Sequence, residues 1–241
     1  MCTVTYIPDE HGDFVFTSSR DESPLRNTIP PKIYEEQGVS LLYPKDIVAG
    51  GSWVLLSENK RLVCLMNAKD DDVAKSYAKS RGVFVKNIAL SSDVFEDLKD
   101  INFSDFAPFT CVVLDWTNAN FSLEIIWDGK LLQCQELNNR PRIWSSSSLY
   151  SDAVQKDRQT WFKSWLSTQE TLTELNPLSF HNNSTVGTPT TAIRMKRSHV
   201  ETVSITTIAK KGDVISMSYL DLLTSKQTKV SFDTVLDAIN I

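Results

Sequence analysis

The sequence predicts an α+β protein built from mainly antiparallel sheets. Short β-branched runs separated by tight turns fill most of the chain. A few segments with helical periodicity lie between blocks of these strands. This order of elements is typical of α+β domains with stacked sheets.

The first third of the chain predicts two hairpins separated by an irregular segment. Strands at 2–7 and 13–19 flank the turn DEHGD, and strands at 53–56 and 61–66 flank the turn SENK. Between the hairpins, residues 24–46 contain four prolines, which interrupt regular structure. We therefore expect this segment to be irregular.

The middle and end of the chain predict three helices and five strands. Residues 70–82 place Val73, Tyr77 and Arg81 on one helical face, with Gly82 as the C-cap. Residues 91–101 predict a second helix with Ser92 or Asp93 as its N-cap. Strands are expected at 109–116, 120–127 and 130–137, and on both sides of the turn at 209–213. The longest helix is expected at 151–169, and its residues on one stripe are Val154, Arg158, Trp161, Phe162 and Trp165.

Composition narrows the class of protein. The 241 residues, 41% of them hydrophobic, are enough for one large domain over 1–241. The net charge of −5 and the sequence pI of about 5.3 argue against binding to nucleic acid or to an anionic membrane. No apolar stretch has the length of a membrane span, and no signal peptide is evident. We therefore expect a cytoplasmic protein that is not inserted into a membrane.

The cysteine and histidine inventory predicts neither a metal site nor a cofactor. Cys64, Cys111 and Cys134 lie in strand-like runs and are expected to be reduced, buried thiols. The three histidines are His11, His181 and His199, and none has a metal-type partner at the right spacing. A histidine-based triad is improbable from this inventory.

Cys2 has two interpretations. It is either a small hydrophobic residue at the start of a strand or, once Met1 is removed, the N-terminus of the mature chain. Removal of Met1 is expected because the second residue is small. The new terminus would carry a thiol and a free α-amine, and an α-amine that titrates near pH 8 can serve as the general base for its own thiol.

Four short motifs occur at a spacing that resembles one known family. They are Met1-Cys2, Ser19-Arg20-Asp21-Glu22, Gly50-Gly51-Ser52-Trp53 and LVCLMN ending at Asn67. In this combination they resemble the NRDE family (DUF833), which includes the proteins of the transport-and-Golgi-organisation 2 type. That family is similar to the N-terminal nucleophile (Ntn) hydrolases of the choloylglycine hydrolase and penicillin V acylase kind. The resemblance implies a four-layer αββα sandwich of two mainly antiparallel sheets.

The resemblance also implies roles for individual residues. Cys2 would be both nucleophile and base, and Asp21 would hold the α-amine. Asn67 would donate to the oxyanion, and Arg197, in preference to Arg194, would orient the catalytic centre. Each motif also has a purely structural interpretation: Arg20, Asp21 and Glu22 as a solvated strand end, Gly50 to Trp53 as a turn before a core tryptophan, and Asn67 as a strand-end residue.

The chain departs from the family pattern at three positions. Ser19 stands where the motif has asparagine, and Ser146 is the best match to a second asparagine expected before the 151–169 helix. A serine hydroxyl can still donate to an oxyanion, although over a shorter reach. Arg20 is one position away from the arginine of the hydrolases.

The sequence therefore leaves three hypotheses about function. The first is an amidohydrolase or acyltransferase that uses Cys2 on a small amide or acyl substrate. The alternative is a non-catalytic protein of the same fold that binds or carries a small molecule such as haem or a lipid, which the resemblance brings in. The third is a scaffold without a small ligand, since fold alone does not settle function.

Overall fold

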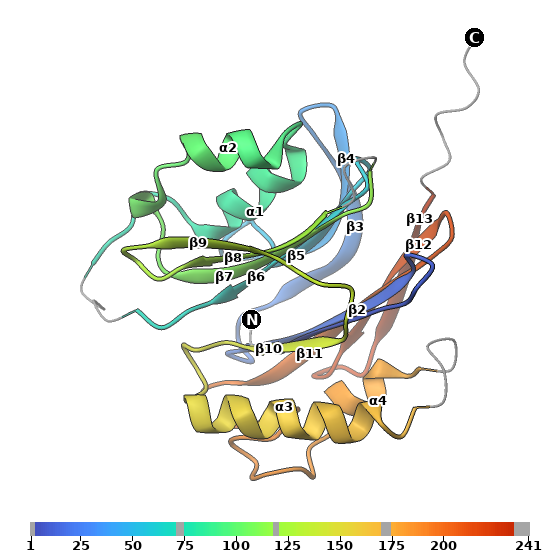
Figure 1. The fold of residues 1–241 in the computed structure, drawn as a ribbon. Coiled ribbons are helices and arrows are strands. Elements are labelled where there is room, and N and C mark those ends of the chain that lie inside the picture. Colours follow the sequence, from blue (N-terminus) through green and yellow to red (C-terminus); the bar gives the residue numbers. More distant parts are fainter. Residues whose placement is uncertain (1–2, 71–74, 118–120, 170–174, 234–241) are drawn as a thin grey trace. The chain divides into compact units, whose positions relative to one another are not determined.

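The computed structural model describes residues 3–70, 75–117, 121–169 and 175–233 of the chain, which forms two compact units (Figure 1). Unit 1 consists of Met1–Arg26 and Asn139–Ile241, and unit 2 is the continuous segment Asn27–Asn138. Unit 2 is therefore inserted in the sequence between the second and third strands of unit 1.

Unit 1 contains a six-stranded antiparallel sheet. The second strand of the chain lies next to a strand formed by residues 201–211, so residues 179 to 196 positions apart become neighbours. In spatial order the strands are β10 (Arg142–Ser145), β1 (Thr3–Pro8), β2 (Phe14–Glu22), β11 (Glu201–Lys211), β12 (Val214–Asp221) and β13 (Gln227–Asp233).

The β1–β2 hairpin forms where the sequence predicted it. The Asp9 carboxylate accepts hydrogen bonds from the backbone N–H groups of His11 and Asp13, both at 2.8 Å. Gly12 has a φ of +80°, which is the left-handed region that favours glycine. The turn thus fixes the register in which Thr3 pairs with Ser19.

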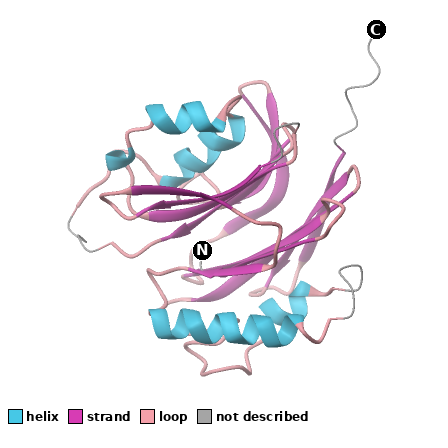
Figure 2. Ribbon diagram, viewed as in Figure 1, coloured by secondary structure: helices cyan, strands magenta, loops and turns pink. Residues whose placement is uncertain are grey.

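Two helices, α3 (Asp152–Leu166) and α4 (Pro177–His181), lie along one face of this sheet (Figures 1 and 2). The apolar stripe predicted for the long helix is confirmed, because Phe162 is buried against Ile7 and Phe180. Arg158 lies on the same stripe and is completely buried. A buried arginine in an apolar stripe requires polar partners, which are described below.

Unit 2 contains a seven-stranded antiparallel sheet in which consecutive strands are neighbours. Its strands are β3 (Thr28–Glu36), β4 (Val39–Asp46), β5 (Val54–Ser57), β6 (Arg61–Asn67), β7 (Phe109–Asp115), β8 (Phe121–Trp127) and β9 (Leu132–Glu136). Helices α1 (Arg81–Leu90) and α2 (Val94–Asp100) and the 3₁₀ turn η1 (Phe103–Asp105) pack against this sheet (Figure 2). Asp93 caps α2, as predicted, through bonds from the N–H groups of Phe95 and Glu96.

The core of unit 2 is apolar and rich in aromatic side chains. Phe84 of α1 is completely buried, and its ring lies 4.6 Å from that of Phe109 and 5.9 Å from those of Phe103 and Phe106. Arg61 is a buried exception. Its guanidinium pairs with Asp115 at 2.8 Å and also donates to carbonyl oxygens at the end of α1.

The predicted irregular segment at 24–46 is instead the β3–β4 hairpin. Pro30 and Pro31 are tolerated because β3 lies at the edge of the sheet, and the register shifts between Ile29 and Lys32, where they lie. Pro44 of β4 lies opposite this register shift and beyond Leu41 and Leu42, the residues that pair with β5. The turn Gln37-Gly38 has positive φ at both residues, which matches the twist of a hairpin.

The helix predicted over 70–82 was also wrong where the structure describes it. Residues 75–80 are not helical, residues 71–74 lie outside the described part, and α1 begins at Arg81, so Gly82 lies in its first turn. The N–H of Lys79 donates to the carbonyl of Asp105 rather than to a carbonyl one helical turn earlier. The predicted class, α+β with two mainly antiparallel sheets, is confirmed.

Candidate active site

Asp21 lies near the end of β2 and is buried. The hydroxyl of Tyr150 donates to Asp21 Oδ2 at 2.6 Å, and the hydroxyl of Thr202 donates to Asp21 Oδ1 at 2.6 Å. A register shift in β11 between Thr202 and Ser204 accompanies this contact, and such bulges re-aim side chains. Two segments far from Asp21 in the sequence thus hold its buried carboxylate.

Arg158 of α3 contacts the tyrosine that donates to this carboxylate. Its guanidinium lies 3.5 Å from the centroid of the Tyr150 ring, and it donates to Thr3 Oγ1 and to the carbonyl oxygens of Thr191 and Ala192. The charge is therefore buried with four polar or aromatic partners. Arg158 also connects β1 with the tyrosine that holds Asp21.

His181 of α4 contacts residues of the neighbouring strands β1 and β2. One ring nitrogen is 2.9 Å from Thr5 Oγ1, and the other is 2.8 Å from Ser19 Oγ. Burial, and then the nearby positive charge of Arg158, lower the pKa of His181 from 6.5 to about 3. His181 is therefore neutral at physiological pH, and its hydrogen bonds link β1 to β2.

Cys2 lies outside the described residues, but the residues that surround its neighbour in sequence are described. Thr3, which follows Cys2, is the first residue of β1 and pairs with Ser19 on one side and Ser145 on the other. Asp21 lies on the strand next to β1. The strand that continues from Cys2 is thus anchored at its first described residue.

The other residues predicted for the site have different surroundings. Arg20 donates to the carbonyl of Arg26 at 3.0 Å, and Glu22 pairs with Arg26 at 3.3 Å. Ser146 is buried, with its hydroxyl 2.8 Å from that of Ser148, and its carbonyl accepts from the N–H of Tyr150. These residues shape the turns on which Asp21 and Tyr150 depend.

Arg197 and Asn67 are the two remaining predicted site residues. Arg197 donates to the carbonyl oxygens of Leu149 and Thr190, and its guanidinium lies 5.3 Å from the Tyr150 ring. It therefore flanks the same tyrosine as Arg158. Asn67 belongs to unit 2, where it is the last residue of β6 and pairs with Phe109.

Sequence reasoning missed the side chains that hold Asp21. Tyr150 and Thr202 carried no signal, because nothing in a single sequence joins positions 21, 150 and 202. Arg158 did carry one, since a charged residue on an apolar helical stripe must be either at the edge of the buried face or paired inside it. His181 was set aside because it lacked a metal-type partner, although both of its ring nitrogens form hydrogen bonds, one as donor and the other as acceptor.

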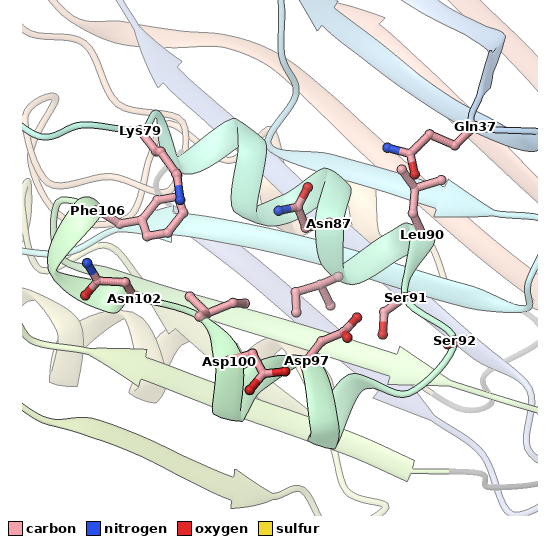
Figure 3. A pocket seen from close by; sticks show the side chains of 12 residues that line it. Gln37, Lys79, Asn87, Leu90, Ser91, Ser92, Asp97, Asp100, Asn102 and Phe106 are labelled. Atoms are coloured by element: carbon pink, nitrogen blue, oxygen red, sulfur yellow. The ribbon is translucent and has the colours of Figure 1, made fainter.

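Unit 2 contains a separate cavity of about 580 Å³ beside α1 and α2 (Figure 3). Asn87, Ser91, Asp97 and Asp100 are among the described residues that line it, and no predicted site residue is among them. Within the described ranges, no group of three or more His, Cys, Asp or Glu side chains is placed to bind a metal ion. The helices in those ranges also include none with the length and apolar character needed to cross a membrane.

Comparison with known families identifies the chain. A family model described as Transport and Golgi organisation 2 matches residues 1–232. The chain belongs to the Transport and Golgi organisation 2 family. No curated protein sequence matches it.

Several solved structures share the fold of this member of the Transport and Golgi organisation 2 family. One is the Caenorhabditis elegans ortholog of N-acylethanolamine-hydrolyzing acid amidase (TM-score 0.58, 11% identity, 86% of this chain and 92% of that chain). Another is the C2A mutant of the conjugated bile acid hydrolase from Clostridium perfringens (TM-score 0.54, 9% identity, all of both chains). A further variant of that hydrolase gives a TM-score of 0.55 at 10% identity over 99% of both chains. The predicted relation to Ntn hydrolases is confirmed at the level of fold.

Proposed function

We propose that this protein is an Ntn-type amide hydrolase or acyltransferase that acts on a small acyl amide through Cys2. The observation that carries the proposal is the buried carboxylate of Asp21, which lies on the strand beside β1 and accepts hydrogen bonds from the hydroxyl groups of Tyr150 and Thr202. A buried carboxylate with two short hydrogen bonds is suited to hold a cationic group such as an α-ammonium. The names of the structural neighbours, which specify hydrolysis of an N-acylethanolamine and of a conjugated bile acid, support an amide substrate.

The mechanism requires removal of Met1. The α-amine of Cys2 takes the thiol proton, and the thiolate attacks the substrate carbonyl to give a tetrahedral oxyanion. The α-ammonium then protonates the leaving amine, and a thioester remains on Cys2. Water, or a second amine in a transferase, attacks the thioester and releases the acyl group with the thiol restored.

Asp21 has the role of holding and orienting the α-amine in this proposal. Asn67 as an oxyanion donor stays a prediction from the sequence, tested by the loss of kcat in Asn67→Ala. Removing one oxyanion donor typically costs about 10²–10³ in kcat. Ser146 as a second oxyanion donor also stays a prediction from the sequence, and its hydroxyl lies 2.8 Å from that of Ser148. The hydroxyl of Ser19 lies 2.8 Å from a ring nitrogen of His181, and we assign it a structural role.

Intact mass and thiol reactivity test this proposal together. We expect protein purified from its own source to lack Met1 and Cys2 to react with iodoacetamide faster than an ordinary thiol at pH 7.5. A panel of N-acyl amides should be cleaved by the native protein and not by Cys2→Ala. Cys134→Ser is the matched control, because Cys134 is an exposed cysteine of unit 2.

A retained Met1 would contradict the proposal, since Cys2 would then have no free amine. Hydrolysis that persists in Cys2→Ala would contradict it as well. An intact, unreactive Cys2 combined with tight binding of haem or a lipid would instead support the non-catalytic alternative.

A further inference from the structure

We infer that Tyr150 and Arg158 are positioning residues for Asp21. Arg158 fixes the position of both this carboxylate and the first described residue of β1. The inference rests on the proposed function of Asp21 and extends it to two residues that neither the family match nor the sequence motifs assign. Neither residue touches the reacting atoms in this proposal. Each acts through Asp21.

The contact between Tyr150 and Asp21 is short and directional. A phenol hydroxyl 2.6 Å from a buried carboxylate oxygen is a charge-assisted hydrogen bond, which fixes the orientation of the carboxylate. The hydroxyl of Thr202 donates to the other carboxylate oxygen at the same distance. With both oxygens held, the carboxylate cannot rotate without losing a bond in a buried setting.

Arg158 strengthens this arrangement from the other side of the ring. A guanidinium 3.5 Å from the ring centroid is attracted to the π-electrons, and its positive charge makes the phenol a better donor. Arg197 adds a second guanidinium at 5.3 Å. Arg158, Tyr150 and Asp21 thus form a row of cation, ring and anion.

The same guanidinium also holds the first described residue of β1. Arg158 donates to Thr3 Oγ1, and two backbone carbonyls on the 191–192 segment fix the remaining N–H groups. Thr3 is joined to Cys2 by one peptide bond. One side chain therefore links the carboxylate proposed to hold the α-amine with the strand that begins at that amine.

The charged and titratable groups near Asp21 agree with this role. Arg158 and Arg197 both contact the Tyr150 ring, and His181 is kept neutral beside Arg158. A neutral histidine avoids a second positive charge next to the guanidinium. The carboxylate thus faces hydroxyl donors directly and the fixed charge of Arg158 across the ring.

The test is the alkylation rate of Cys2 in the full chain, measured with iodoacetamide between pH 6 and 9 and read by mass at the Cys2 peptide. It needs no knowledge of the substrate. The variants are Tyr150→Phe, Arg158→Met, Arg158→Lys and Asp21→Asn. Tyr43→Phe is the matched control, because Tyr43 is also buried and donates to a carboxylate, that of Glu36, in unit 2.

We expect Tyr150→Phe and Arg158→Met to lower the rate at pH 7 about tenfold, the effect of one charge-assisted hydrogen bond, and to move the half-maximal pH upward. Arg158→Lys should recover part of the rate, because it keeps the charge while losing the planar fork. Tyr43→Phe should react like the native protein. A merely structural role would lower stability in all of these variants without changing the pH profile.

Two results would overturn the inference in distinguishable ways. If Asp21→Asn is slowed while Tyr150→Phe and Arg158→Met are not, the positioning role is wrong and the proposed function stands. If Asp21→Asn also reacts like the native protein, the proposed function of Asp21 fails and the inference fails with it. If Arg158→Met does not fold, Tyr150→Phe still decides, since it removes a single oxygen atom.

Discussion

The two units of the molecule use the same architecture with different interiors. Each packs helices against an antiparallel sheet, but the interior of unit 2 is filled by apolar and aromatic side chains around Phe84. In unit 1 the face that contacts α3 and α4 also buries two sets of polar side chains. Hydrogen bonds and one cation–ring contact join Thr3, Asp21, Tyr150, Arg158 and Thr202, and hydrogen bonds join Thr5, Ser19 and His181, which is close enough to Arg158 to feel its charge. We call the two sets together the Asp21 network.

The two interiors constrain the positions of their side chains in different ways. Apolar packing is non-directional and tolerates small shifts, whereas a buried hydrogen-bonded network is costly unless each member keeps its partner. Unit 2 also buries an ion pair, Arg61 with Asp115, but it uses that pair to satisfy carbonyls at the end of α1. Unit 1 arranges its polar side chains around one carboxylate beside the N-terminal strand.

The largest expected effect on stability comes from the apolar core. Phe84→Ala should lower the free energy of unfolding by about 3–5 kcal/mol, because a large cavity remains in a rigid cluster. Urea denaturation measures the loss. The rate of Cys2 alkylation in the folded protein should not change, and a parallel loss of reactivity would show that the two units are not independent in this respect.

Acid should weaken the Asp21 network through His181. The folded pKa of about 3 lies below the usual 6.5, so the unfolded chain binds a proton in a pH range in which the folded protein does not. This contribution is complete above pH 6.5 and is lost as the pH falls from 6.5 toward 3, at up to about 1.4 kcal/mol per pH unit. Between pH 7.5 and 5.0 the expected loss is about 2 kcal/mol.

Denaturation of His181→Asn at both pH values checks this prediction, since the variant should lose that part of the pH dependence. His11→Gln is the matched control, because His11 is exposed at the hairpin turn. The same pH dependence in the native protein and in His181→Asn would refute the assignment.

A smaller effect should come from the second donor to Asp21. Thr202→Val leaves Asp21 Oδ1 and the N–H of Met195 without this partner in a buried setting, and we expect a loss of about 1–3 kcal/mol. Thr117→Val removes an equivalent threonine–aspartate bond in unit 2, where Asp115 keeps Arg61. Thermal and urea denaturation of both variants should give the larger loss for Thr202→Val.

The smallest effect should come from the outer end of the predicted motif. Glu22 pairs with Arg26, and both side chains are about one third exposed. Glu22→Gln should therefore change the free energy of unfolding by no more than about 0.5 kcal/mol. A loss above about 1 kcal/mol, or a change in Cys2 reactivity, would give Glu22 a role that its surroundings do not indicate.

Local patterns in the sequence predicted the hairpins and the long helix because their causes are local. The Asp9 turn, the alternation in β1 and the stripe on α3 all depend on residues a few positions apart. The β3–β4 hairpin was missed because Pro30 and Pro31 lie on an edge strand, at a register shift that also faces Pro44 of β4, and neither feature is visible in the local sequence. The absence of a helix at residues 75–80 depended on a distant partner, Asp105, whose carbonyl accepts from the N–H of Lys79.

The candidate site was predictable only in part for the same reason. The motif resemblance directed attention to Asp21, which is buried and doubly bonded. Its two hydroxyl donors come from the turn before α3 and from the register shift in β11, and each depends on long-range pairing. The alternation of β2 places Arg20 and Asp21 on opposite faces, so adjacent letters of one motif have unrelated surroundings.

The insertion of unit 2 into unit 1 has a consequence for biosynthesis. Asp21 leaves the ribosome 181 residues before Thr202, and at about 5–20 residues per second this delay is roughly 10–40 s. Unit 2 is continuous and can be completed during that time, whereas the β1–β2 hairpin waits without its neighbours β10 and β11. The segment proposed to carry the chemistry is thus made before unit 2 and gains its neighbouring strands after unit 2.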